Sequence, residues 1–229
     1  MEVLGLMPGA SNYTFLCRLG PEMEGEAEDG AGERLAIYKP RRGEAPLWDF
    51  PSGTLCQREV AAYLVSAAAG FDLVPPTVLR DGPAGPGSVQ AFVHHDFDCT
   101  AFDLYRSNDA DLRRIALFDL VINNADRKAG HVFVDVGGHV WAIDHGICFH
   151  AEPKLRTVLW DFAGTPITDG ERALLDRLVE ALTGDLGDRL RPLLDAEERV
   201  ALRRRLRAAR GAKVFPQPGP GRSFPWPPV

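Results

Sequence analysis

The sequence predicts an α+β protein with two lobes: a small antiparallel β-lobe that carries one helix, and a mostly helical lobe that contains an inserted hairpin. Two observations support this prediction. Up to about residue 93, short apolar runs recur between turn residues, and only residues 55–69 show helical spacing. From residue 109 onward helical spacing dominates, and residues 132–143 interrupt it with two short apolar runs split by Gly137 and Gly138.

The composition is that of a globular protein, because 45% of the 229 residues are apolar and 25% are charged. A net charge of −6 provides no general attraction to nucleic acid or to an anionic membrane. The four cysteines lie far apart without a C-x-x-C spacing, which favours a reducing cytoplasm over disulfides or a zinc site. We find no signal-peptide pattern and no apolar run near the ~20 residues of a membrane span, so we expect a cytoplasmic protein without a transmembrane segment. Peripheral contact with a membrane stays open.

The first lobe is predicted over residues 1–93. Its turn at Gly9, Ala10, Ser11 and Asn12 separates two strands within residues 3–19, and residues 20–33 are acidic and glycine-rich, as in an exposed loop. Three more strands are predicted, at 35–40, 74–79 and 88–93, with a turn over 81–87 between the last two. Helix 55–69 ends at Gly70, a typical C-cap residue.

The second lobe is predicted over residues 94–214. A helix from residue 109 precedes the hairpin, whose strands are 132–135 and 139–143. An irregular segment, 147–165, carries many apolar residues and is expected to pack over the site. Helices are predicted at 169–182, 184–194 and 195–210. The tail, 215–229, is too rich in proline for a helix or a central strand.

Two aspartates flank the hairpin and are the candidate chemical centre. Asp126 follows Asn123-Asn124-Ala125, and Asp144 follows the second strand, so the folded hairpin is expected to bring the two carboxylates together. A base and a metal ligand are what phosphoryl transfer needs. Asp126 is therefore predicted to accept or position a substrate hydroxyl, and Asp144 to bind the metal ion of a nucleotide. Taken singly, each is also a common turn residue.

Lys39 is the candidate phosphate ligand. Only four of the 26 basic residues are lysines, so each lysine marks a position where arginine was not used. Lys39 ends a strand, and Glu59 lies twenty residues later on the predicted helix, an arrangement that protein kinases use to orient a lysine on nucleotide phosphates. The alternative is an exposed lysine and an exposed glutamate.

Two further features are less specific. The turn that contains Ser11 and Asn12 offers backbone N–H groups and polar side chains to a phosphate, although it is neither a Walker A sequence nor G-x-G-x-x-G, and an ordinary hairpin turn fits equally well. His131 is expected to bind the metal directly, to hydrogen-bond one of the two aspartates, or to pack at the start of the strand. Imidazole suits Mn²⁺ or Zn²⁺ better than Mg²⁺. The spacing of the other histidines does not indicate a zinc site.

Four segments, 36–40, 58–63, 123–131 and 143–146, resemble the phosphatidylinositol 3-/4-kinase-like family of actinobacteria. More distantly, they are similar to type II phosphatidylinositol 4-kinases and HipA-type kinases. The resemblance implies a bilobal protein-kinase-like fold that binds ATP with Mg²⁺ or Mn²⁺. It implies that Lys39 contacts the phosphates, Glu59 orients Lys39, Asp126 is catalytic and Asp144 binds the metal.

The resemblance also implies that residues 90–94, including Gln90, Phe92 and Val93, form the hinge that faces adenine. Two departures from the family pattern stand out. The family has an asparagine, a second metal ligand, where this chain has His131. The basic activation segment that reads a lipid headgroup is reduced here to Lys154 and Arg156 within residues 147–165.

We therefore predict a kinase that transfers the ATP γ-phosphate to an unidentified hydroxyl acceptor, with a soluble acceptor favoured over phosphatidylinositol. No nucleic-acid partner is expected. Two alternatives stay open: a pseudokinase that binds nucleotide or acts as a scaffold, and a nucleotidyl (AMP) transferase that uses the same cleft.

Overall fold

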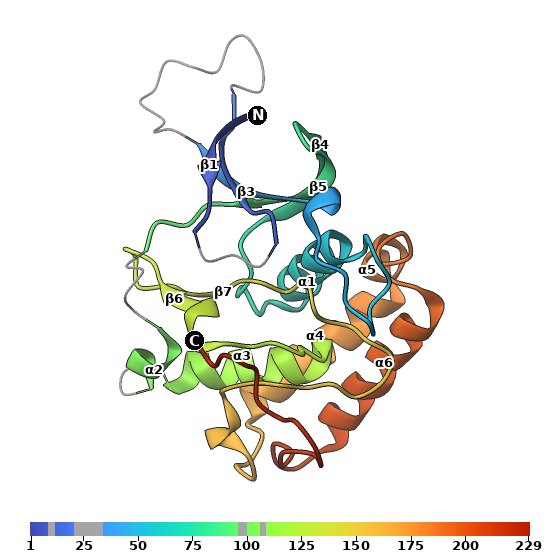
Figure 1. Ribbon diagram of the computed structural model, residues 1–229. Coiled ribbons are helices and arrows are strands. Elements are labelled where there is room, and N and C mark those ends of the chain that lie inside the picture. Colours follow the sequence, from blue (N-terminus) through green and yellow to red (C-terminus); the bar gives the residue numbers. More distant parts are fainter. Residues whose placement is uncertain (9–11, 21–33, 96–99, 106–108) are drawn as a thin grey trace.

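The computed structural model describes residues 1–8, 12–20, 34–95, 100–105 and 109–229. The predicted turn residues Gly9, Ala10 and Ser11 lie outside these ranges, as does the predicted loop except for its first residue. Figure 1 shows a sheet at one end of the molecule and helices at the other, with the hairpin of β6 (Val132–Val134) and β7 (Val140–Ala142) between them. The predicted α+β fold with two lobes is confirmed.

An antiparallel sheet forms the first lobe. Its strands are β1 (Glu2–Leu6), β2 (Phe15–Arg18), β3 (Leu35–Pro40), β4 (Thr77–Gly82) and β5 (Gly85–Ala91). Their order in the sheet is β1-β2-β3-β5-β4. On β3 the side chains of Ala36 and Tyr38 are buried in a small core with Cys17 and Val89. Because side chains alternate along a strand, the neighbouring Lys39 lies on the opposite face of β3 from this core.

The predicted turn over residues 81–87 is wrong in its length. Strands β4 and β5 stay paired up to Gly82 and Gly85, so the turn consists only of Pro83 and Ala84. Proline suits the first central position of a tight turn, and Gly85 takes a positive φ of 97° that glycine tolerates. Backbone pairing extends the strands through residues whose side chains carry no strand pattern, which is why their composition indicated a longer loop.

Helix α1 (Leu55–Ala69) lies between the sheet and the other helices, as Figure 1 shows. It ends as predicted, with Gly70 in the left-handed conformation at φ 72°. Its apolar residues, including Leu64 and Val65, belong to the main hydrophobic core together with residues of the second lobe such as Leu117 and Leu178. One helix therefore joins the sheet to the helical lobe.

The second lobe is built mainly from helices: α2 (Ala101–Leu104), α3 (Asp109–Ile122), α4 (Asp169–Thr183), α5 (Asp185–Arg189) and α6 (Ala196–Gly211). Helix α4 begins as predicted after Thr168, whose hydroxyl accepts a hydrogen bond from the N–H of Glu171 at 3.2 Å. The short helix α2 was not predicted. The predicted helix 184–194 is too long, since α5 ends at Arg189: Pro192 lacks an N–H and disfavours helical geometry in the residue before it.

Single 3₁₀ turns complete the framework: η1 (Arg41–Gly43), η2 (Ala129–His131) and η3 (Trp160–Phe162). The tail beyond α6 contains neither helix nor strand, as predicted. Across the described ranges, none of the helices combines the length and the apolar character needed to cross a bilayer. Cys17, Cys56 and Cys148 are buried free thiols, and Cys99 lies outside the described residues.

Candidate active site

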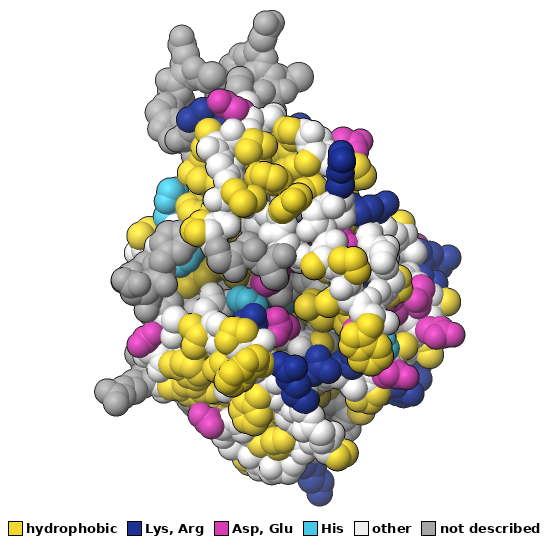
Figure 2. Space-filling model, in the orientation of Figure 1, with side chains coloured by type: hydrophobic (Ala, Val, Ile, Leu, Met, Phe, Trp, Pro, Cys, Tyr) yellow, Lys and Arg dark blue, Asp and Glu magenta, His cyan; other side chains and the backbone are white. Residues whose placement is uncertain are grey.

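A cavity of about 440 Å³ opens where the sheet faces the second lobe. It gathers the predicted site residues from both lobes. Those that line it are Asn12, Lys39, Glu59, Gln90, Phe92, Val93, Asp126, His131 and Asp144. Ser11 lies outside the described residues. In Figure 2 a hollow across the middle of the molecule shows histidine, acidic and basic side chains together.

Lys39 lies between two carboxylates at the centre of this cavity. Its Nζ is 2.5 Å from Oε1 of Glu59 and 2.9 Å from Oδ1 of Asp144. Burial by itself lowers the pKa of a lysine, but the charges of Asp144 and Glu59 outweigh burial and hold the pKa of Lys39 above its usual value. The side chain is therefore a fixed cation over the physiological pH range.

Glu59 connects helix α1 to the segment that follows the hairpin. Its side chain is almost fully buried, and its second oxygen, Oε2, accepts a hydrogen bond from the backbone N–H of His145 at 2.9 Å. Both carboxylate oxygens are thus occupied, one by Lys39 and one by the residue next to Asp144. This arrangement sets the spacing between Lys39 and Asp144.

Asp144 follows β7 and has a left-handed backbone, with φ at 59°. A non-glycine residue rarely adopts this conformation, which costs of the order of 1–3 kcal/mol and is concentrated at functional sites. The cation of Lys39 holds the pKa of the Asp144 carboxyl well below its usual range. About half of the side chain is exposed, so the charged carboxylate is accessible from the cavity.

His131 stands beside Asp144, with its Nε2 3.3 Å from Oδ2 of the aspartate. Burial, together with the cations of Arg127, Lys39 and Lys128, lowers the pKa of His131 to about 4, even though the charge of Asp144 acts in the opposite direction. The ring is therefore neutral at physiological pH and can offer a lone pair. Its Nδ1 is buried, and no hydrogen-bond partner for it exists within the part of the chain that the structure describes.

Asp126 is positioned by the loop that precedes the hairpin. Its backbone N–H donates to Oδ1 of Asn124 at 2.9 Å, and Nδ2 of Asn124 donates in turn to Oδ1 of Asp119 at 2.9 Å. The side chain is about one quarter exposed, and its Oδ2 lies 3.6 Å from Nζ of Lys128. Burial raises the pKa of Asp126, and Lys128 opposes this increase.

A buried network under the site was missed by the sequence analysis. Arg127 is fully buried and binds Asp119 through two hydrogen bonds, of 2.8 and 3.0 Å. It also donates to Nε2 of His145 at 2.7 Å and to the carbonyl of Ile143 at 2.9 Å. Since Arg127 has only donors, Nε2 of His145 must be the acceptor.

This network fixes the loop of Asp126 to the segment of Asp144. A basic residue next to a candidate catalytic aspartate was the only available signal, and it did not identify Asp119 or His145 as partners. Arginine is required here because it directs several hydrogen bonds at once in a fixed plane, which lysine cannot do.

Several residues are suited to the base and phosphates of a nucleotide. Gln90, Phe92 and Val93 line the cavity, although the side-chain amide of Gln90 already donates to Oγ1 of Thr77 at 2.9 Å. His95, which was not predicted, also lines the cavity, and its ring stacks on Phe133 with 3.6 Å between centroids. A flat, apolar wall of this kind suits an aromatic base.

Asn12 lines the cavity and also holds two loops together. Its Oδ1 accepts a hydrogen bond from the backbone N–H of Ala45 at 2.7 Å, so the turn is tied to the loop after β3.

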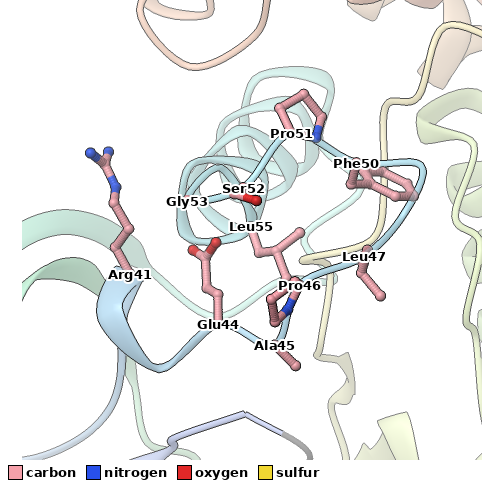
Figure 3. Close-up of a pocket in the computed structure, with 10 residues that line it drawn as sticks. All are labelled: Arg41, Glu44, Ala45, Pro46, Leu47, Phe50, Pro51, Ser52, Gly53 and Leu55. Carbon is pink, nitrogen blue, oxygen red and sulfur yellow. The ribbon is translucent and has the colours of Figure 1, made fainter.

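A smaller hollow of about 120 Å³ lies along the loop after β3 where this loop meets the start of α1, and Figure 3 shows Arg41 extending away from it. Of the predicted site residues, none lines this second hollow.

Comparisons with known proteins show which family the chain belongs to. Residues 79–181 match the family model described as phosphatidylinositol 3- and 4-kinase. Over 99% of its length the chain is 41% identical to Protein Rv2133c of Mycobacterium tuberculosis, of which the match covers 91%. It is 29% identical to phosphatidylinositol 4-kinase gamma 8 of Arabidopsis thaliana over 75% of the chain, but it spans only 40% of that protein.

A solved structure shares the fold. The proinflammatory kinase CtkA of Helicobacter pylori superimposes with a TM-score of 0.52 over 92% of this chain and 91% of its own, at 11% sequence identity. At that identity the likeness concerns the fold alone, which is kinase-like. Together with the 41% identity over nearly the whole chain, these findings settle the family. The chain belongs to the actinobacterial branch of the phosphatidylinositol 3- and 4-kinase-like family.

Proposed function

We propose that the protein is an ATP- and divalent-metal-dependent phosphotransferase that moves the γ-phosphate of ATP to a hydroxyl acceptor. The observation that carries the proposal is the position of Lys39, which is paired with both Glu59 and Asp144 inside a cavity that also contains Asp126. Phosphoryl transfer depends mainly on positioning and on charge, and these residues supply both.

Lys39 is the residue assigned to the nucleotide phosphates. Its ammonium is permanently charged and is oriented by Glu59, so the cation need not reorganise when the phosphates arrive. Because Lys39 and Asp144 are in contact, a phosphate oxygen bound to Lys39 would lie next to a metal ion bound to Asp144. The base of the nucleotide is assigned to the wall that contains Phe92, Val93 and His95.

Asp144 and His131 fit a divalent metal ion. Two donors bound about 2.1 Å from one ion at right angles lie about 3.0 Å apart, close to the 3.3 Å between Nε2 of His131 and Oδ2 of Asp144. The neutral ring of His131 is in the state that a ligand requires. A bound metal ion supplies charge neutralisation on the phosphate oxygens.

No group of three or more His, Cys, Asp or Glu side chains within the described ranges could hold an ion by itself. The remaining ligands are therefore assigned to nucleotide oxygens and water, which is usual for Mg²⁺ and Mn²⁺ at phosphates. On this assignment Asp144→Ala removes the dependence of nucleotide affinity on the metal.

Asp126 is assigned to the acceptor hydroxyl. Its side chain is partly exposed in the cavity, and its loop is held by Asn124 and by the buried Arg127 network. A carboxylate at this point accepts the hydroxyl hydrogen bond and directs the oxygen towards the γ-phosphorus. Lys128, 3.6 Å away, adds a positive charge near the oxygen atoms that gain negative charge.

A soluble acceptor fits the segment 147–165 better than phosphatidylinositol does. Phe149, Leu159 and Phe162 of this segment are buried in the main core, so they are not available to a bilayer. Lys154 is paired with Asp49 at 2.9 Å and is therefore not a free cation for a lipid headgroup. These contacts support a covering element rather than a lipid-reading loop.

The test compares ATP labelled with ³²P at the γ- or the α-position, in the presence of a metabolite extract, a protein extract or phosphatidylinositol vesicles. Transfer of the γ-label that depends on Asp126 supports the proposal. Transfer of the α-label indicates a nucleotidyl transferase. Nucleotide binding with no transfer of either label indicates a pseudokinase, and Asp126-dependent labelling mainly of the vesicles overturns the preference for a soluble acceptor.

A further inference from the structure

The proline-rich end of the chain returns to the cavity. From α6 it crosses the second lobe and ends beside the hairpin, as Figure 1 shows. The carbonyl of Ser223 accepts two hydrogen bonds, from the N–H of Thr157 at 3.1 Å and from Nε1 of Trp160 at 2.9 Å. The carbonyl of Pro228 accepts a third, from the N–H of Ala129 at 2.8 Å. Residues 222–229 are thus anchored at both ends.

The second anchor lies next to the candidate catalytic residue. Ala129 is three positions after Asp126, and Val229 lines the same cavity as Asp126 and Lys128. The side chain of Val229 also lies against Gly130, where an added Cβ would be 4.0 Å from it. The segment therefore borders the side of the cavity where the acceptor hydroxyl is expected.

Proline content makes this border stiff. Three of the eight residues 222–229 are prolines: Pro225 is buried, and Pro227 and Pro228 directly precede Val229, which lines the cavity. Proline restricts φ, so the segment loses little conformational entropy on docking. By contrast, the side chain of Phe224 is about half exposed and does not line the cavity.

We propose that residues 222–229 form the outer wall of the acceptor side of the cavity and restrict the acceptor to small, free hydroxyl compounds. This inference rests on the proposed phosphotransferase function and specifies its substrate class. With the wall in place the cavity measures about 440 Å³, near the lower end of the ~300–1,000 Å³ typical of small-molecule sites. A stiff segment at this edge narrows the acceptor side of the cavity, which favours a small molecule over a folded protein surface or a lipid bilayer.

Charge supports the same placement. The cation of Arg222 is one of the charges that lower the pKa of Asp126 against the raising effect of burial, so Arg222 lies within electrostatic reach of that carboxylate. Removing this cation alone, by Arg222→Ala, is then expected to raise the pKa of Asp126 and to shift the acidic limb of the pH–rate profile upward. Loss of overall stability would not move this limb.

The experiment compares the full chain with a chain that ends at Gly221. The shortened chain keeps Phe215, which is buried against Phe162 in the main core. Both are given γ-labelled ATP with a mixture of a dialysable metabolite fraction, a protein fraction and phosphatidylinositol vesicles. We expect the full chain to label the dialysable fraction, and the shortened chain to raise the share in the bulky acceptors by at least about tenfold at unchanged ATP affinity.

Two point variants test the inference within the full-length chain. Trp160→Phe removes one of the two hydrogen bonds to Ser223 and keeps an aromatic ring, so it is expected to raise the share of label in the bulky acceptors as well, but by less. Phe224→Ala is the matched control, because that side chain belongs to the segment but not to the cavity, and its acceptor share should equal that of the full chain.

The inference is overturned if the full chain, the shortened chain and Trp160→Phe all transfer label and divide it between small and bulky acceptors in the same proportion. A shortened chain that loses ATP affinity while Trp160→Phe leaves the share unchanged also overturns it, since the segment would then serve the nucleotide side. ATP binding without transfer in every chain is a different result: it rejects the phosphotransferase function itself, and the inference is rejected with it.

Discussion

Nε2 of His131 lies 3.3 Å from Oδ2 of Asp144, so that a nitrogen donor and an oxygen donor face the same point of the cavity. An all-oxygen pair is the usual choice for Mg²⁺, which is a hard cation, whereas Mn²⁺ accepts imidazole more readily. The position of His131 therefore sets an expectation about which metal the site uses.

We predict that ATP binds more tightly with Mn²⁺ than with Mg²⁺, and that His131→Asn reduces the advantage of Mn²⁺ by about tenfold, in the range seen when groups around a metal ligand are lost. Isothermal titration of ATP in each metal measures both values. His94→Asn is the control, because His94 is exposed and does not line the cavity. An unchanged Mn²⁺-to-Mg²⁺ ratio in His131→Asn would show that His131 is not a ligand.

Asp126 is predicted to act on turnover and not on nucleotide binding. Asp126→Ala should lower kcat by about 10⁴-fold, the size found when one member of a catalytic group is removed, while the Kd for ATP stays within about twofold. The reason is that Asp126 is assigned to the acceptor hydroxyl and Lys39 to the phosphates. Loss of ATP binding with turnover per bound nucleotide preserved would reverse this assignment.

Arg127→Lys is predicted to destabilise the protein by about 1–3 kcal/mol, because a lysine ammonium cannot keep both hydrogen bonds to Asp119 and also donate to Nε2 of His145. Urea unfolding measures this change in the free energy of unfolding. Arg207→Lys, an exposed change on α6, should lie within about 0.5 kcal/mol of the parent chain. Equal stability of the two variants would mean that the network is not needed to hold the loop of Asp126.

Stability should depend on pH through His131. Its pKa is about 4 in the folded chain and near 6.5 when unfolded, so between these values the unfolded state binds the additional proton. The free energy of unfolding is therefore highest above pH 6.5 and falls by about 3 kcal/mol from this group as the pH decreases towards 4. Urea unfolding of the metal-free chain across this interval measures the slope.

The matched variant for the pH dependence is His131→Asn, which cannot titrate in this interval. Its free energy of unfolding should change less steeply with pH than that of the parent chain, and the difference should correspond to one bound proton. The remaining slope is expected to come partly from His145, since burial and the charge of Arg127 hold the pKa of that histidine well below its usual value. Identical slopes in the two chains would show that protonation of His131 is not linked to unfolding.

Much of the fold could be predicted because its signals are local. Alternation along residues 35–40 and helical spacing over 55–69 are properties of a few neighbouring residues, and Gly70 ends its helix through its own φ. One error came from backbone pairing between strands, and the other from a local proline signal that was overlooked. Backbone pairing extended β4 and β5 into the predicted turn, and Pro192 shortened α5.

The candidate residues could also be chosen from the sequence, because chemical type and position at a strand end or turn single out Lys39, Asp126 and Asp144. Their mutual geometry could not. Lys39 and Asp144 are separated by 105 positions, and they come to 2.9 Å where Glu59 of α1 contacts both Lys39 and the segment after the hairpin. The partner of Arg127 could not be chosen either, since any nearby acid would have satisfied the sequence pattern.

The sequence by itself therefore determined the fold class, most of the secondary structure and the chemical groups from which a site could be made. The tertiary structure decided which of those groups meet: Lys39 with Asp144, Arg127 with Asp119, and Val229 with the cavity of Asp126. The physical reason is that secondary structure depends on backbone preferences and on periodic burial over a few residues. Contacts between distant residues depend instead on how whole elements pack, and no local pattern records that packing.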